Sequence, residues 1–214
     1  MKDSTALILI DLQLDFFPGG ALGVSHADKL FPLVNTLQNY FSHVIATKDW
    51  HPPTHKSFAS HHPEHKVFDV VDLRGLPQVL WPDHCVPGTR GSEFHPELKT
   101  ERIEKVIYKG MDPEVDSYSA FFDNAHQRET GLDTYLKSEG IKTLYFLGLA
   151  TDYCVFYSAL DALELGYEAF IIQDACFGIN KTPGDVEHAL ATMREKGASL
   201  TDSQTLFKTR KILT

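Results

Sequence analysis

Residues 143–166 contain the pattern that most constrains the fold, which is a buried strand followed at once by a helix. The run from Leu144 to Leu149 is apolar and β-prone, and it stops at the small, polar residues 150–152. After this break, apolar side chains recur at helical spacing, at Val155, Ala159, Ala162 and Leu163. Cys154 is therefore expected in the first turn of a helix that follows a buried strand.

Cys154 has two interpretations at such a position. The free N–H groups and the positive dipole end of a helix start favour a thiolate, which is the nucleophilic form of cysteine. A free cysteine is also among the residue types most often buried as a small apolar group. Position alone leaves both interpretations open.

The rest of the chain repeats the alternation of strands and helices. Strands are expected at 6–10, 43–47, 104–108, 144–149, 169–173 and 199–201, and helices at 27–41, 131–139, after Cys154, and at 185–196. This order predicts an α/β fold, a three-layer α/β/α sandwich with a mainly parallel, Rossmann-like six-stranded sheet. With 214 residues and no repeat or linker, a single domain over 1–214 is expected.

The net charge, the number of cysteines and the N-terminal sequence indicate which partners and which cellular compartment to expect. A net charge of −9 disfavours nucleic acid and anionic membranes, which leaves a small molecule or a protein, including a second copy of the chain. The three cysteines (Cys85, Cys154 and Cys176) are too few for a secreted disulfide scaffold and suit reduced thiols. The short apolar run near the N-terminus resembles neither a signal peptide nor a membrane span, so a cytoplasmic protein is expected.

One group of candidate residues comes from the ends of three predicted strands. Asp11, Lys109 and Cys154 each lie at or just beyond such an end, and parallel α/β sheets bind ligands at that edge. The lysine favours a thiolate, and the aspartate can accept the thiol proton and return it to a leaving group. Each residue could instead have a purely structural role: Asp11 as a cap or turn residue, Lys109 as a surface charge and Cys154 as part of the core.

A second group has the composition of a metal site. Asp49 and His51 are two residues apart on an extended segment and can point to the same side, and His84 can join them from the irregular, histidine-rich stretch 50–102. Two imidazoles and one carboxylate suit zinc, iron or manganese with positions left for a ligand. His55 and Ser57 are close enough in sequence to add a ligand, directly or through water.

Five segments carry a resemblance to a known family. In chain order they are IDLQLDFFPGG, TKDWHP, VLWPDHCVPGT, YKGMDPEVDSYSAFFDN and GLATDYCV. Together they resemble the nicotinamidases (pyrazinamidases) of the isochorismatase-like cysteine hydrolase family, from about residue 5 to about residue 177. The resemblance implies hydrolysis of nicotinamide to nicotinate and ammonia through a cysteine thioester, in NAD salvage, and deamidation of pyrazinamide.

The same resemblance implies a role for each candidate residue. Asp11, Lys109 and Cys154 would form the catalytic triad, and Asp49, His51 and His84 would hold one divalent metal ion, zinc first, with iron or manganese as alternatives. The peptide joining Leu149 to Ala150 would be cis, and the N–H groups of Ala150 and Cys154 would form an oxyanion hole. The aromatic-ring pocket would be lined by Phe16, Trp81, Tyr118 and Tyr153, which could otherwise be core residues.

Three alternatives stay open at this point. A related amidase acting on a ureido or carbamoyl substrate would share the triad without needing the metal set. A metal-activated water could act while Cys154 is a bystander. The fold could also serve as a catalytically idle binding domain.

Overall fold

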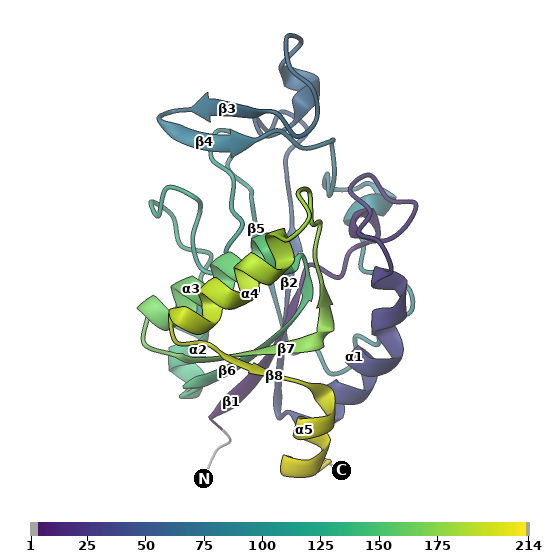
Figure 1. Ribbon diagram of the computed structural model, residues 1–214, viewed down its shortest axis with the longest axis vertical. Helices are drawn as coiled ribbons and strands as arrows, with labels where there is room; N and C mark the ends of the chain where they lie inside the picture. The colour runs from purple at the N-terminus through teal and green to yellow at the C-terminus, as the bar shows by residue number, and fades with distance from the viewer. Residues whose placement is uncertain (1–3, 213–214) are drawn as a thin grey trace.

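The computed structural model describes residues 4–212 and contains a six-stranded sheet in the order β5-β2-β1-β6-β7-β8 (Figure 1). Every pair of neighbouring strands in it is parallel. The strands are β1 (Thr5–Ile10), β2 (His43–Asp49), β5 (Lys105–Lys109), β6 (Thr143–Leu149), β7 (Glu168–Phe177) and β8 (Ser199–Thr201). The predicted Rossmann-like α/β fold is confirmed.

The centre of the sheet is buried on both faces, which explains the aliphatic sequence of its strands. Residues Ala6–Ile10 of β1 are fully inaccessible to solvent, as a strand covered on both sides requires. β1 pairs with β2 on one side and with β6 on the other. The chain order reverses between β1 and β6, so the ligand-binding edge is expected at the carboxyl ends of these two strands.

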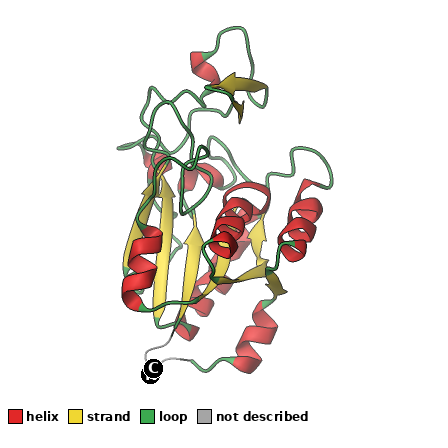
Figure 2. Ribbon diagram, turned by 90° about the vertical axis from the view of Figure 1, so that its left-hand side faces the viewer, coloured by secondary structure: helices red, strands yellow, loops and turns green. Residues whose placement is uncertain are grey.

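Helices cover both faces of the sheet (Figures 1 and 2). They are α1 (Phe31–Leu37), α2 (Leu132–Glu139), α3 (Phe156–Glu164), α4 (Asp185–Glu195) and α5 (Ser203–Thr209). One core cluster contains residues of α1 and α5, such as Val34 and Leu206. The other contains residues of α2, α3 and α4, such as Leu136, Ala159 and Met193. The two clusters are the two interfaces of a three-layer sandwich.

Several boundaries differ from the sequence prediction. The helix expected at 27–41 is a short α1 between 3-10 turns at Ala27–Leu30 and Gln38–Tyr40, and β7 continues four residues beyond the predicted end. The helix α5 was not predicted, although Asp202 caps it by accepting a hydrogen bond from the Thr205 N–H at 2.7 Å.

A small antiparallel hairpin was also not predicted. It consists of β3 (Val70–Leu73) and β4 (Leu76–Val79), joined by Arg74 and Gly75, which both have positive φ. In Figure 1 it lies beyond the end of the sheet where the catalytic candidates are found, and Figure 2 shows loops gathered past the strand tips there. No helix within residues 4–212 is long and apolar enough to cross a membrane.

Candidate active site

The structure brings Asp11, Lys109 and Cys154 together although they come from three different strand ends. Lys109 Nζ lies 2.9 Å from Asp11 Oδ2 and 3.3 Å from Cys154 Sγ. All three side chains are buried, and Lys109 is only 1% exposed. An ammonium group so deeply buried needs partners, and here they include the other two residues of the predicted triad.

Thr47 of β2 fixes the orientation of the Asp11 carboxylate. The Thr47 hydroxyl donates to Asp11 Oδ1 at 2.6 Å and accepts from the Asp11 N–H at 3.1 Å. The second carboxylate oxygen, Oδ2, is then directed at Lys109. The sequence analysis missed Thr47, because a threonine inside a strand resembles any other β-branched strand residue.

The two candidate groups share Asp49. Its Oδ1 accepts a hydrogen bond from Lys109 Nζ, which also donates to the Ser117 carbonyl at 3.2 Å. Its Oδ2 faces the histidines of the second group. The sequence also places Asp49 at a predicted strand end, on the same edge of the sheet. Its contact with Lys109 follows from the register in which Asp49 of β2 lies opposite Lys109 of β5.

Burial and charge set the protonation of the triad. Burial, opposed by Lys109 and reinforced by Asp49, raises the pKa of Asp11 above its usual value. Burial also raises the pKa of the Cys154 thiol well above its usual value, and Lys109 offsets this only in part. Although burial disfavours its charge, the carboxylates of Asp11 and Asp49 hold the pKa of Lys109 well above the usual range. Burial therefore opposes formation of the Cys154 thiolate, and the charge of Lys109 favours it.

The predicted metal ligands also meet. Asp49 Oδ2 lies 3.5 Å from His51 Nε2 and 3.7 Å from His84 Nε2. His51 Nδ1 lies 3.0 Å from the Gly110 carbonyl, and His84 Nδ1 lies 2.8 Å from the Pro82 carbonyl. Each Nδ1–H is thus engaged, which leaves the Nε2 lone pairs beside the carboxylate, as in metal-binding histidines.

The backbone of Asp49 is held by a residue that the sequence analysis missed. Gln13 is fully buried, donates through Nε2 to the Asp49 carbonyl at 2.8 Å, and accepts from the Asp49 N–H through Oε1 at 2.8 Å. Gln13 lies two residues beyond Asp11, so one segment positions both carboxylates. A glutamine just after a strand gives no signal in the sequence alone.

His55 and Ser57 are buried next to the metal set, together with Asp116, which the sequence analysis did not select. The His51 and His55 ring centroids are 4.4 Å apart. One ligand atom each from His51, His55 and Asp116 forms a second group whose members lie within 4.8 Å of one another. Burial lowers the pKa of His55 to about 4, so its ring is neutral.

The turn before Cys154 has the backbone that the family resemblance predicts. The Leu149–Ala150 peptide is cis, and the Ala150 carbonyl accepts hydrogen bonds from the Tyr153 and Val155 N–H groups. Residues Thr151–Val155 form a π-helical turn that leads into α3, so Cys154 lies in the first turn of the helical segment. The N–H groups of Ala150 and Cys154 remain the candidates for an oxyanion hole.

The four predicted aromatic residues line one cavity together with Cys154 and the predicted metal ligands. The Trp81 and Tyr153 rings meet edge to face at 4.9 Å between centroids, and Trp81 Nε1 donates to the Tyr118 hydroxyl at 3.3 Å. Phe16 packs against the His84 ring at 5.5 Å. One aromatic-lined cavity thus contains both the Cys154 thiol and the predicted metal ligands.

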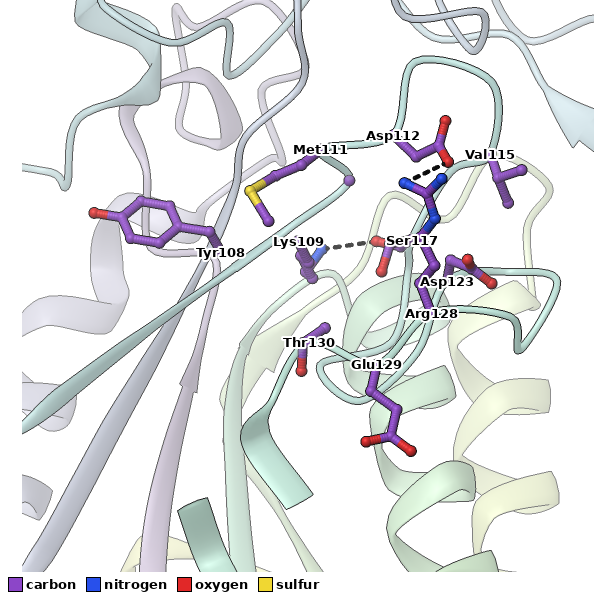
Figure 3. Close-up of a pocket in the computed structure, with 11 residues that line it drawn as sticks. Tyr108, Lys109, Met111, Asp112, Val115, Ser117, Asp123, Arg128, Glu129 and Thr130 are labelled. Atoms are coloured by element: carbon purple, nitrogen blue, oxygen red, sulfur yellow. Dashed lines mark hydrogen bonds and ion pairs between the residues drawn. The ribbon is translucent and has the colours of Figure 1, made fainter. Parts of the chain in front are cut away.

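A second cavity is lined by Lys109 and by residues from the segments 108–117 and 123–130 (Figure 3). Lys109 and Ser117 are joined by a hydrogen bond in this view, and Arg128 pairs with Asp112 at 2.9 Å. Cys154 and the predicted metal ligands line the aromatic cavity and not this one, whereas Asp11 lines neither cavity. The candidate nucleophile and the predicted metal ligands therefore both face the aromatic cavity.

Comparison with known proteins decides the family. The isochorismatase domain matches residues 5–205. The chain belongs to the isochorismatase family. Among curated members, the chain is 47% identical over 199 residues to a nicotinamidase of Escherichia coli, covering 91% of this chain and 93% of that protein.

Solved structures of the family agree with the fold. A nicotinamidase/pyrazinamidase of Acinetobacter baumannii matches with a TM-score of 0.93 and 44% identity, over 95% of this chain and 98% of that one. The yeast nicotinamidase bound to the inhibitor nicotinaldehyde matches with a TM-score of 0.86 and 28% identity, over 92% of this chain and 99% of that one. A pyrazinamidase of Pyrococcus horikoshii in complex with zinc matches with a TM-score of 0.77 and 36% identity, over 93% of this chain and 99% of that one.

Proposed function

We propose that this isochorismatase-family chain is a nicotinamidase, which hydrolyses nicotinamide to nicotinate and ammonia and also deamidates pyrazinamide. The observation that carries the proposal is the aromatic cavity that has Cys154 at one side and the Asp49, His51 and His84 group at another. A pyridine carboxamide has the matching chemistry, with a flat ring, a basic ring nitrogen and an electrophilic amide carbon. The 47% identical nicotinamidase supports the same substrate.

The donor set fits one divalent metal ion. Asp49, His51 and His84 would hold it. Nδ1 of each histidine faces a backbone carbonyl, which leaves Nε2 for the metal. Lys109 pairs with Oδ1 of Asp49, which leaves Oδ2 for the metal. When bound, the metal supplies Lewis-acid coordination for the ring nitrogen of the substrate. The zinc complex of the Pyrococcus horikoshii relative supports zinc first, and the ligand set also admits iron or manganese.

Asp11 is the proton carrier of the proposed mechanism. It takes the thiol proton of Cys154. Because its pKa is raised, Asp11 is a stronger base than an exposed aspartate would be. The sulfur then attacks the amide carbon, while the Lys109 ammonium, 3.3 Å from Sγ, stabilises the negative charge that develops on sulfur. Asp11 next delivers the proton to the departing ammonia.

The oxyanion formed by this attack would be held by the N–H groups of Ala150 and Cys154. Such a donor is typically worth about 3 kcal/mol in the transition state. A water molecule, deprotonated by Asp11, then attacks the thioester carbon, the C–S bond breaks, and nicotinate leaves with the cysteine restored as a thiol. Lys109 keeps its charge throughout because the two carboxylates surround it.

The alternatives from the sequence are less well supported. A bystander Cys154 does not account for its contact with a buried lysine that also pairs with Asp11. A ureido or carbamoyl substrate would leave the Asp49 group without a task. The nicotinamidases at 47% and 44% identity also support the nicotinamide reaction over both alternatives and over an idle domain. We further propose a single-domain cytoplasmic enzyme of NAD salvage.

One assay tests the function. Ammonia release from nicotinamide is measured for the protein as purified, after chelation, and after zinc is restored. The proposal expects activity that chelation lowers, mainly through a higher KM, and that zinc restores. If nicotinamide is not hydrolysed under any of these conditions while a ureido substrate is, the alternative amidase is correct.

A further inference from the structure

Three buried histidines meet at the metal side of the cavity, but their rings are held in different ways. His51 Nδ1 faces the Gly110 carbonyl at 3.0 Å, and His84 Nδ1 faces the Pro82 carbonyl at 2.8 Å. A carbonyl oxygen only accepts hydrogen bonds, so Nδ1 carries the proton in both rings. In the neutral form, each of these rings therefore has a lone pair at Nε2, which is what a metal ligand requires.

The ring of His55 is held in the opposite way. The Ser57 N–H donates to His55 Nδ1 at 3.2 Å, and the Ser57 hydroxyl lies 2.7 Å from the same nitrogen. A backbone N–H only donates, so Nδ1 of His55 must be an acceptor, and the hydroxyl can donate to it as well. The proton of the neutral ring is then on Nε2. His55 therefore directs an N–H, and not a lone pair, away from Ser57.

Asp116 is the acceptor that lies nearby. Its Oδ1 accepts from the Ser117 N–H at 2.7 Å and its Oδ2 accepts from Gln78 Nε2 at 3.0 Å, so the carboxylate is fixed. Within the described part of the chain, His55 Nε2 is fully buried and has no hydrogen-bond partner. One ring nitrogen of His55 and one carboxylate oxygen of Asp116 lie within 4.8 Å of each other. A histidine ring and a carboxylate at such a separation can be bridged by one water molecule.

We propose that His55 is a hydrogen-bond donor which, together with Asp116, holds a water molecule beside the metal set, and that His55 is not a metal ligand. Its Nε2–H donates to the water oxygen, and the water donates to the Asp116 carboxylate. His55 is thus a positioning residue, which acts on the metal group through this water and Asp116. The inference rests on the proposed metal site but not on the identity of the amide that is hydrolysed.

Nitrogen NMR of the histidine rings tests the proton position directly. Protein with 15N-labelled histidine is recorded metal-free and after zinc is added, and the His55→Gln variant assigns the His55 signals. The expected result is a protonated Nε2 and an unprotonated Nδ1 for His55, both before and after zinc. An unprotonated Nε2, or an Nε2 signal that moves to the metal-bound position when zinc is added, overturns the proposal.

Matched variants test the ligand count. Glutamine retains an N–H donor near the Nε2 position but is a weak zinc ligand. The zinc affinity of His55→Gln should therefore stay within about threefold of the wild type. The zinc affinity of His84→Gln should fall about 100-fold or more. The absorption spectrum of the cobalt-loaded protein should be unchanged in His55→Gln. A loss in His55→Gln as large as in His84→Gln, with an altered cobalt spectrum, contradicts the proposal. None of these measurements uses nicotinamide, so failure of the proposed function would be recognised separately.

Discussion

Replacing Thr47 with valine tests how the proposed proton carrier is held. Thr47 and valine have nearly the same shape, and residue 47 is fully buried, so the change removes the hydroxyl with little change in packing. The hydroxyl donates to Asp11 Oδ1 at 2.6 Å, and a hydrogen bond to a charged group typically contributes about 1.5–3 kcal/mol. If that energy orients Asp11 in the transition state, kcat/KM should fall about 10- to 100-fold.

The pH dependence of Thr47→Val provides a second readout with a definite sign. The Thr47 hydrogen bond favours the charged form of Asp11 and thereby lowers its pKa, partly opposing the effect of burial. Removing it raises the pKa of Asp11, so more of the carboxylate is protonated at a given pH and cannot accept the thiol proton. The acidic limb of the kcat/KM profile should therefore move to higher pH.

The assay is the pH profile of ammonia release for the wild type, Thr47→Val and Thr47→Ser. Serine keeps the hydroxyl and is the matched control, so its acidic limb should stay near that of the wild type. An unshifted profile and an unchanged kcat/KM in Thr47→Val would refute the role of Thr47. Equal losses in the serine and valine variants would show that packing, and not the hydrogen bond, matters.

Two further predictions concern the supports of the metal set. In Gly110→Ala, the new Cβ would overlap the His51 ring at a φ of +69°, so His51 must move. Zinc affinity should therefore fall at least about 10-fold in calorimetric titrations, and unaltered binding would contradict this. Gln13→Leu removes the two hydrogen bonds to the Asp49 backbone. The free energy of unfolding, measured by urea denaturation, should therefore fall by about 2–3 kcal/mol. A variant as stable as the wild type would show that these bonds are dispensable.

The fold was predictable because each strand of the sheet has a local signature. The fully buried β1 is an uninterrupted aliphatic run, and alternation with helices implies parallel pairing and right-handed crossovers. The hairpin at 70–79 and the helix α5 have weaker signatures. Arg74 and Gly75 are not a typical hairpin-turn pair, and α5 has only seven residues.

The residues proposed to carry the chemistry lie at predictable places, whereas the residues that hold them in position do not. Asp11 and Cys154 lie at strand ends, where the topology itself points to function. Thr47 and Gln13 each act through two hydrogen bonds to a residue 36 positions away in the chain, Asp11 and Asp49 respectively. No local pattern encodes such a contact, because it depends on the register between strands. The tautomer of His55 likewise depends on the backbone geometry at Ser57.

Cys154 is the proposed nucleophile, and mass spectrometry of the rapidly acid-quenched protein during turnover of nicotinamide tests this role. We expect an added mass equal to a nicotinoyl group, located by peptide mapping on Cys154 and absent in Cys154→Ala, whose turnover should be abolished. An acyl group on another residue, or ammonia release that persists in Cys154→Ala, would contradict it.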